Sequence, residues 1–304
     1  MKPWFLAVFC AVAASLPAAQ DGGQSQAWTK LGLGARSAGI GRAVSALKDD
    51  VGATLLNPAL LATQKVMNVG SQLAVLPDGR QINYLGIGSL LGPRSDWAMG
   101  LGYTQYGLSQ PLERRKGNTP EADSTFSEGA SSFQVGWGAW AWAHRLSLGL
   151  DIKVLNHSLG DASATGLSMD LGAFGQAVDW LDWGWVLRDP FSRVAWNTDA
   201  SESLPLQSRL GVALHWPGRE LHGFLELAYR QGQTWGHYEG VEGWLLGQTL
   251  GLRAGFEDGQ WRLGLGARWK MWAVDGRLDY ALGSEATSEG SFQHRFSLDL
   301  GFPL

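Results

Sequence analysis

The sequence predicts an all-β protein, a 14-stranded antiparallel transmembrane β-barrel with a short N-terminal plug-like helical segment. Glycine supplies 42 of the 304 residues, which disfavours a helix-rich chain because each interior glycine costs a helix about 1 kcal/mol. From residue 66 onward, apolar and polar residues alternate with a period of two, which is typical of strands. The only apolar stretch near the length of a membrane helix lies at the N-terminus, so a polytopic helical membrane protein is excluded.

Residues 1–19 are predicted to be a secretory signal peptide. Lys2 precedes an apolar run from Trp4 to Leu16, and small residues follow, so cleavage is expected after Ala18 or Ala19. A membrane anchor is the alternative, but the run is short and lacks a stop-transfer flank. The one cysteine, Cys10, lies within this segment, so the mature chain is expected to form no disulfide.

Residues 20–65 are predicted to form a plug or cap ahead of the barrel. The stretch Ala43–Asp50 is expected to be a short helix. Asn57 followed by Pro58 is typical of a helix start, with asparagine at the N-cap and proline at the first helical position. The alternative is an unstructured leader, which the orderly caps and apolar residues disfavour.

Residues 66–304 are predicted to form the barrel. Leu148, Leu150 and Ile152 illustrate the pattern, because they alternate with Gly149, Asp151 and Lys153. Single-chain outer-membrane barrels have an even number of strands, and fourteen segments fit. The expected strands are 66–76, 80–91, 95–106, 130–142, 144–156, 164–175, 179–189, 206–216, 220–230, 235–244, 248–257, 260–271, 273–283 and 292–303.

The lengths of the connections agree with this count. Outer-membrane barrels have short periplasmic turns and longer external loops. With both termini in the periplasm, the long connections 107–129, 157–163, 190–205 and 284–291 all fall on the external side. The short connections at 77–79 and 258–260 also fall there and fit the scheme less well.

The apolar face of each strand is expected to face lipid, because a charge there costs about 2–4 kcal/mol at the bilayer midplane. The charged face then lines the lumen, where the candidate charges are Asp151, Lys153, Asp170, Glu242, Arg253, Arg268 and Arg295. Tryptophans near strand ends are expected to form interfacial girdles at both ends of the barrel, with sugar stacking as an alternative role. A large soluble β-sandwich or barrel with the apolar face inward is the alternative architecture.

No pattern of a catalytic site is present. The six histidines lack the spacing of a zinc-binding helix, and no nucleotide-binding glycine motif or serine-nucleophile turn occurs. Asp151 and Asp170 could form a carboxylate pair, but a ladder of lumen charges is the preferred interpretation. We expect no enzyme activity, no cofactor and no metal, and a pI near 5.9 disfavours a nucleic-acid partner.

Three short stretches of the N-terminal segment occur in a familiar order: Ala35–Gly41, Asp49–Asp50 and Asn57–Leu61. In this order they resemble the PorV/PorQ family of the FadL-like superfamily of outer-membrane β-barrels, and Leu148–Leu155 looks like that family's central strand. Leu60 stands where the family usually has glycine. The resemblance implies a structural or gating role for the plug motif, whose members here are Arg36, Gly39, Gly41, Asp49, Asp50, Asn57 and Pro58.

The resemblance implies an outer-membrane protein acting in type IX protein secretion, with secreted cargo and other secretion components as partners. The alternative is FadL-like transport of hydrophobic small molecules, in which the region from Gly39 to Asn57 gates a pocket that opens sideways to the membrane. Because the expected inward rows are mostly charged residues or glycine, an apolar track is not apparent, which favours secretion. A purely structural barrel is a third possibility.

Overall fold

The computed structural model describes residues 26–91, 96–115, 117, 121–142, 144–216, 218, 220–233, 235–284 and 291–304. The expected signal peptide, residues 1–19, lies outside the described residues. No helix in the described part of the chain is long and apolar enough to cross a membrane.

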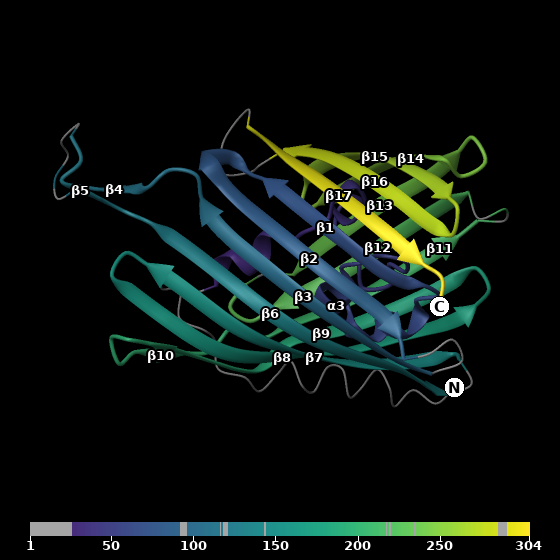
Figure 1. Ribbon diagram of the computed structural model, residues 1–304, viewed down its shortest axis with the longest axis horizontal. Helices are drawn as coiled ribbons and strands as arrows, with labels where there is room; N and C mark the ends of the chain where they lie inside the picture. The colour runs from purple at the N-terminus through teal and green to yellow at the C-terminus, as the bar shows by residue number, and fades with distance from the viewer. Residues whose placement is uncertain are drawn as a thin grey trace.

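Fourteen of the described strands form a closed ring in which all neighbours are antiparallel, so the predicted fold class is confirmed (Figure 1). The ring closes between the first and last strands, where Met67 pairs with Phe302 and Val75 pairs with His294. In ring order, the strands are β1 (Met67–Val75), β2 (Arg80–Leu90), β3 (Trp97–Leu108), β6 (Glu128–Trp142), β7 (Leu146–Leu159), β8 (Ala162–Val178), β9 (Leu181–Trp196), β11 (Gln207–His215), β12 (Leu221–Arg230), β13 (Gly236–Leu245), β14 (Leu250–Glu257), β15 (Gln260–Met271), β16 (Val274–Ser284) and β17 (Phe292–Phe302).

Two connections contain strands that the sequence did not predict. The connection after β3 forms a hairpin of β4 (Leu112–Arg114) and β5 (Ser124–Phe126), which projects at the left of Figure 1. The connection after β9 contains β10 (Ser201–Glu202), which pairs back on β9. Both lie at the end of the barrel opposite Met67 and Phe302; we call the end with Met67 and Phe302 the terminal end and the other the far end.

β9 differs most from the prediction, because it continues to Trp196 and does not stop before Pro190. The pairing of β8 with β9 shifts between Met169 and Asp170, where Met169 faces Phe191 and Asp170 faces Arg188. Asp189 and Pro190 therefore form a bulge. A bulge accommodates a proline, which has no amide hydrogen to donate to a neighbouring strand.

The wall is polar inside and apolar outside, as predicted. On β15, Leu263 and Leu265 point outward with 51% and 52% of their surface exposed, whereas Arg262, Gly264 and Gly266 between and beside them are buried. Exposed tryptophans gather mainly at the terminal end, where the described residues include Trp97, Trp142, Trp180, Trp216, Trp269 and Trp272. At the far end, Trp235 and Trp261 are exposed, so exposed tryptophans lie at both ends, as expected, but more of the described ones lie at the terminal end.

Residues 26–66, which we call the inner segment, lie inside this wall. The segment contains η1 (Ala27–Leu31), α2 (Ala35–Gly39), α3 (Ala53–Leu56) and η2 (Pro58–Thr63). α2 packs against β14 to β17, and η2 packs against β6 to β8, so the segment crosses the interior from one wall to the other. Figure 1 shows it enclosed by the ring of strands.

The predicted helix over Ala43–Asp50 is wrong, because this stretch is irregular, with a turn at Ser45 and Ala46 and a bend at Asp49. Its backbone groups find partners on the wall. The amides of Val44 and Ser45 both donate to Glu226 Oε2, at 2.8 and 2.7 Å. Since a carboxylate of β12 satisfies these donors, the stretch does not need helical hydrogen bonds.

Candidate functional site: the inner segment and its chambers

A network of buried charges holds the first half of the inner segment. Arg36 on α2 donates two hydrogen bonds to Glu242 on β13, from Nε to Oε1 at 2.9 Å and from Nη2 to Oε2 at 2.8 Å. Burial by itself lowers the pKa of the Arg36 guanidinium, but the Glu242 carboxylate outweighs that effect and leaves the pKa above its ordinary value. Arg36 is therefore a permanent cation tied to the wall by a fork-shaped pair.

The network continues across three more strands. Arg253 on β14 contacts Glu242 at 2.7 Å and Asp279 at 2.8 Å, and Asp279 also accepts from Arg277 at 2.8 Å. Arg277 returns to the inner segment, where its Nη2 lies 3.4 Å from Asp50 Oδ2, and it also pairs with Asp299 of β17. We call this set the charged anchor: Arg36, Asp50, Glu242, Arg253, Arg277, Asp279 and Asp299.

Neutral contacts hold the second half of the segment. Asn57 caps η2 by accepting the Ala59 amide at 3.1 Å, and its Nδ2 donates to the carbonyls of Ser45 at 2.8 Å and Ala173 at 3.2 Å. The wall also donates to the segment, from Ser147 Oγ to the Ala59 carbonyl at 2.9 Å and from Trp140 Nε1 to the Ala62 carbonyl at 2.8 Å. We call these contacts the neutral anchor.

Glycines of the wall let the backbone of the segment approach closely. A Cβ at Gly149 of β7 would overlap the backbone of Pro58 and Ala59, and one at Gly172 of β8 would overlap the Asn57 side chain. On the opposite wall, Gly39 of the segment faces Gly264 of β15, with the Cβ position of Gly39 3.1 Å from the Gly264 Cα.

The structure places the rest of the predicted plug motif in these contacts. Gly41 has a positive φ of 63°, which favours glycine, and a Cβ there would meet the backbone of β13 and β14. Pro58 is buried against β6 to β8. Asp49 contributes mainly through its carbonyl, which accepts from Arg277 Nη1 at 2.6 Å and from Arg36 Nη1 at 3.2 Å, while its side chain is exposed.

The charged residues that the sequence predicted to face the lumen lie inside the wall, but their surroundings differ. Glu242 and Arg253 belong to the charged anchor. Arg295 donates to the carbonyls of Gly32 and Leu31, and the Arg268 guanidinium lies 3.6 Å from the ring centre of Trp244.

Asp151 and Asp170 face each other across β7 and β8. Lys153 donates to Asp170 at 2.7 Å and to Asp189 at 2.6 Å, whereas neither carboxylate oxygen of Asp151 has a hydrogen-bond partner among the described residues.

Sequence reasoning missed several residues that hold the segment or line the interior. Glu226 was not among the candidates, although it accepts from the inner segment and also pairs with Arg209 of β11. Lys48 pairs with Asp182 of β9 at 2.7 Å. Alternation on β9 and β12 would have identified Asp182 and Glu226 as inward-facing, but no sequence pattern tells which inward charges meet the segment.

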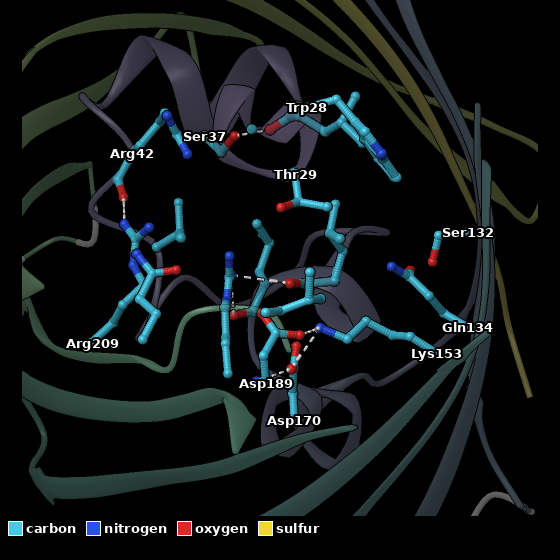
Figure 2. A pocket seen from close by; sticks show the side chains of 18 of the residues that line it. Trp28, Thr29, Ser37, Arg42, Ser132, Gln134, Lys153, Asp170, Asp189 and Arg209 are labelled. Carbon is cyan, nitrogen blue, oxygen red and sulfur yellow. Dashed lines mark hydrogen bonds and ion pairs between the residues drawn. The ribbon is translucent and has the colours of Figure 1, made fainter. Parts of the chain in front are cut away.

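Between the segment and the wall lies a small inner chamber of about 60 Å³ (Figure 2). On one side, Lys153 reaches between Asp170 and Asp189, as Figure 2 shows. The apolar side chains that line it come largely from the inner segment: Trp28, Leu33, Val44, Leu55 and Leu56, joined by Ile82, Leu155 and Leu204. The interior therefore has an apolar surface that the wall alone does not provide.

A larger outer chamber of about 730 Å³ adjoins the inner one, and the two share the lining residues Thr29, Arg42, Arg188, Gln207, Arg209 and Arg230. Its other lining residues include Gly236, His237, Glu257 and Asp258, which lie at the far-end tips of β13 and β14. The outer chamber therefore lies toward the far end of the barrel. Within the described residues, no group of three or more His, Cys, Asp or Glu side chains is placed to hold a metal ion.

Comparisons with solved structures show which fold this is. The toluene transporter TodX of Pseudomonas putida superposes with a TM-score of 0.61 at 13% identity, covering 87% of this chain and 95% of that chain. A Pseudomonas aeruginosa FadL homologue superposes with a TM-score of 0.62 at 12% identity, covering 88% and 97%. A TodX variant described as a monoaromatic hydrocarbon channel superposes with a TM-score of 0.60 at 12% identity, covering 88% and 97%.

No protein-family model matches the chain, and no curated protein matches it in sequence. The expected PorV/PorQ membership therefore has no support from these comparisons. The chain shares its barrel fold with FadL-type transporters and channels.

Proposed function

We propose that this chain is an outer-membrane barrel that passes small hydrophobic molecules, with the inner segment acting as its gate. The observation that carries the proposal is the group of eight apolar side chains in the lining of the inner chamber, most of them from the inner segment, within an otherwise polar lumen. The sequence disfavoured transport because the inward rows of the wall looked charged. The inner segment supplies the apolar surface, so that objection no longer holds.

The outward surface supports a place in a membrane. Rows of half-exposed leucines cover the wall, and tryptophans stand at the strand ends, which suits lipid on the outside. The FadL-type fold supports transport, since TodX, which has this fold, is described as a toluene transporter. Neither the fold nor the chambers require an enzymatic step.

The inner chamber is too small to be an open passage. A volume of about 60 Å³ admits only a few water molecules, since each needs roughly 10–15 Å³. A solute must therefore displace part of the segment. Ala38 on α2 and Ala281 on β16 belong to one small buried cluster and offer a place to prevent that movement.

The test is the double variant Ala38→Cys with Ala281→Cys, in a chain whose only cysteine is Cys10. Cells that carry it are compared with cells that lack the barrel for uptake of radiolabelled toluene. We expect uptake that needs the barrel, stops when the disulfide forms and returns on reduction. Each single-cysteine variant is the control. The proposal is contradicted if cells with and without the barrel take up toluene equally. It is also contradicted if uptake stays unchanged when mass spectrometry shows that the disulfide has formed.

A further inference from the structure

We propose that Arg188 and Arg230 bind the acidic group of a small aromatic anion in the outer chamber. The inference rests on the proposed function, because it names a class of solute that the same passage admits. It starts from the charges of the two chambers, most of which neutralise one another. Lys153 holds Asp170 and Asp189, Arg42 pairs with Glu257, and Arg209 pairs with Glu226.

Two arginines form no ion pair among the described residues, because the carboxylates beside them, Asp170 and Asp189, are held by Lys153. The side chain of Arg230, at the far end of β12, has no hydrogen bond or ion pair among the described residues, and its Nε is buried without a partner. Arg188 donates from Nη2 only to two backbone carbonyls of α3, those of Leu55 at 3.1 Å and Leu56 at 3.0 Å, and its Nε also lacks a partner.

Both arginines line the outer chamber and the inner one. The bulge at Asp189 and Pro190 immediately follows Arg188, on the wall next to β11. Buried guanidinium donors without acceptors are unfavourable, and a bound oxyanion would supply those acceptors. A guanidinium offers a fork of donors that matches a carboxylate or phosphate, so the ligand chemistry is that of an oxyanion.

The rest of the outer chamber favours an aromatic solute. Trp235 lines the rim of the chamber, with 59% of its surface exposed. Its ring also packs against Tyr229 on the outward row of β12, with ring centres 5.3 Å apart. Arg209 lies over the ring of Tyr238, 4.6 Å from its centre, and so occupies that second aromatic face. A volume of about 730 Å³ is in the usual range for sites that bind small molecules. An aryl carboxylate can place its acid on the arginines and its ring on Trp235.

The test is calorimetric binding to the purified barrel in detergent, with three probes. Benzoate has both an aromatic ring and a carboxylate. Benzamide has the same ring with a neutral amide of similar shape, and inorganic phosphate has negative charge but no ring. We expect benzoate to bind, benzamide to show no binding, and phosphate to bind more weakly than benzoate. Benzamide binding as tightly as benzoate overturns the proposal, and phosphate binding more tightly overturns its aromatic part.

Arg230→Gln is the cleaner variant, because Arg230 holds no other part of the protein. It should weaken benzoate binding about tenfold or more, the usual effect of losing a hydrogen bond to a charged group. Arg188→Gln should do the same but also loosens the contact with α3. Arg193→Gln, with the same change of charge on the exposed face of β9, is the matched control. Equal binding by the Arg230 variant and the control overturns the site.

The two proposals fail separately. Arg230→Gln leaves the apolar side of the inner chamber intact, so toluene uptake should be unchanged. If benzoate does not bind and toluene uptake is normal, only the proposed anion site is contradicted. If benzoate binds but the Ala38–Ala281 disulfide leaves toluene uptake unchanged, only the proposal that the inner segment is a gate is contradicted.

Discussion

The two anchors of the inner segment hold it by different physics. The charged anchor joins Arg36 and Asp50 to four strands through buried ion pairs, from β13 to β17. The neutral anchor joins residues 57–62 to the strands β6, β7 and β8. It does so through single hydrogen bonds and through backbone that packs against glycines of the wall. Under the proposed function, both anchors hold the segment that closes the passage.

The difference shows how one short segment is fixed in a polar lumen. Ion pairs inside a protein must replace the lost hydration of every member, so removing one partner leaves an uncompensated charge. Close backbone contact is fixed by shape, so it fails when a side chain is added. The charged side should therefore be sensitive to lost groups and the neutral side to added ones.

The largest effect is expected for Glu242→Ala. It leaves Arg36 and Arg253 buried without their shared carboxylate, which typically costs about 3–5 kcal/mol. We expect that loss in the free energy of unfolding measured by urea titration in lipid vesicles, together with faster proteolysis of the inner segment.

Glu239→Ala is the matched control, since Glu239 lies on the same strand with its side chain exposed. If both variants unfold alike, the charged anchor does not stabilise the segment.

A smaller effect is expected for Gly149→Val, which adds a side chain where Pro58 and Ala59 lie against β7. Overpacking of this kind costs about 1–3 kcal/mol, and it should displace η2 without disturbing Arg36. Hydrogen exchange should speed up at Ala59 to Ala62 alone. Gly223→Val is the control, because a Cβ there meets nothing nearer than 3.9 Å. Uniform exchange changes across the segment would show that the two anchors are one unit.

The smallest effect is expected for Asn57→Ala. The substitution removes the N-cap of η2 and the two hydrogen bonds that Asn57 Nδ2 donates to the carbonyls of Ser45 and Ala173. Loss of a cap alone costs about 0.5–2 kcal/mol. The midpoint of urea unfolding should fall slightly, with the ring of strands intact by circular dichroism. Asn83→Ala, at an exposed position of β2, should leave the midpoint unchanged. An equal fall in both would remove Asn57 from the neutral anchor.

Most of the barrel could be predicted from the sequence, because a spanning strand has one apolar face and one polar face and alternation reports both. The cap at Asn57 could also be predicted, since capping is local. The path of β9 through Pro190 could not, because a bulge depends on how β8 pairs beside it. The irregular course of Ala43–Asp50 was missed for a similar reason, since Glu226 lies far away in sequence yet satisfies two of its amides.

The candidate site was harder to predict than the fold. The sequence predicted which charged residues point inward. It could not predict their ion-pair partners, because these depend on the order of strands around the ring and on where the inner segment crosses the interior. The apolar lining was missed because it belongs to the inner segment, while the search for it considered only the strands. Arg188 and Arg230 stand out only once Lys153, Arg42 and Arg209 beside them are seen to be paired.

The central claim is that the inner segment, held by both anchors, closes the barrel. Its most direct test is the conductance of the native protein in a planar lipid bilayer beside that of Glu242→Ala. We predict that the native barrel stays closed, whereas the variant shows large, intermittent openings as the charged side of the segment detaches. A native barrel that conducts steadily as a wide pore, with the variant indistinguishable from it, would contradict the account.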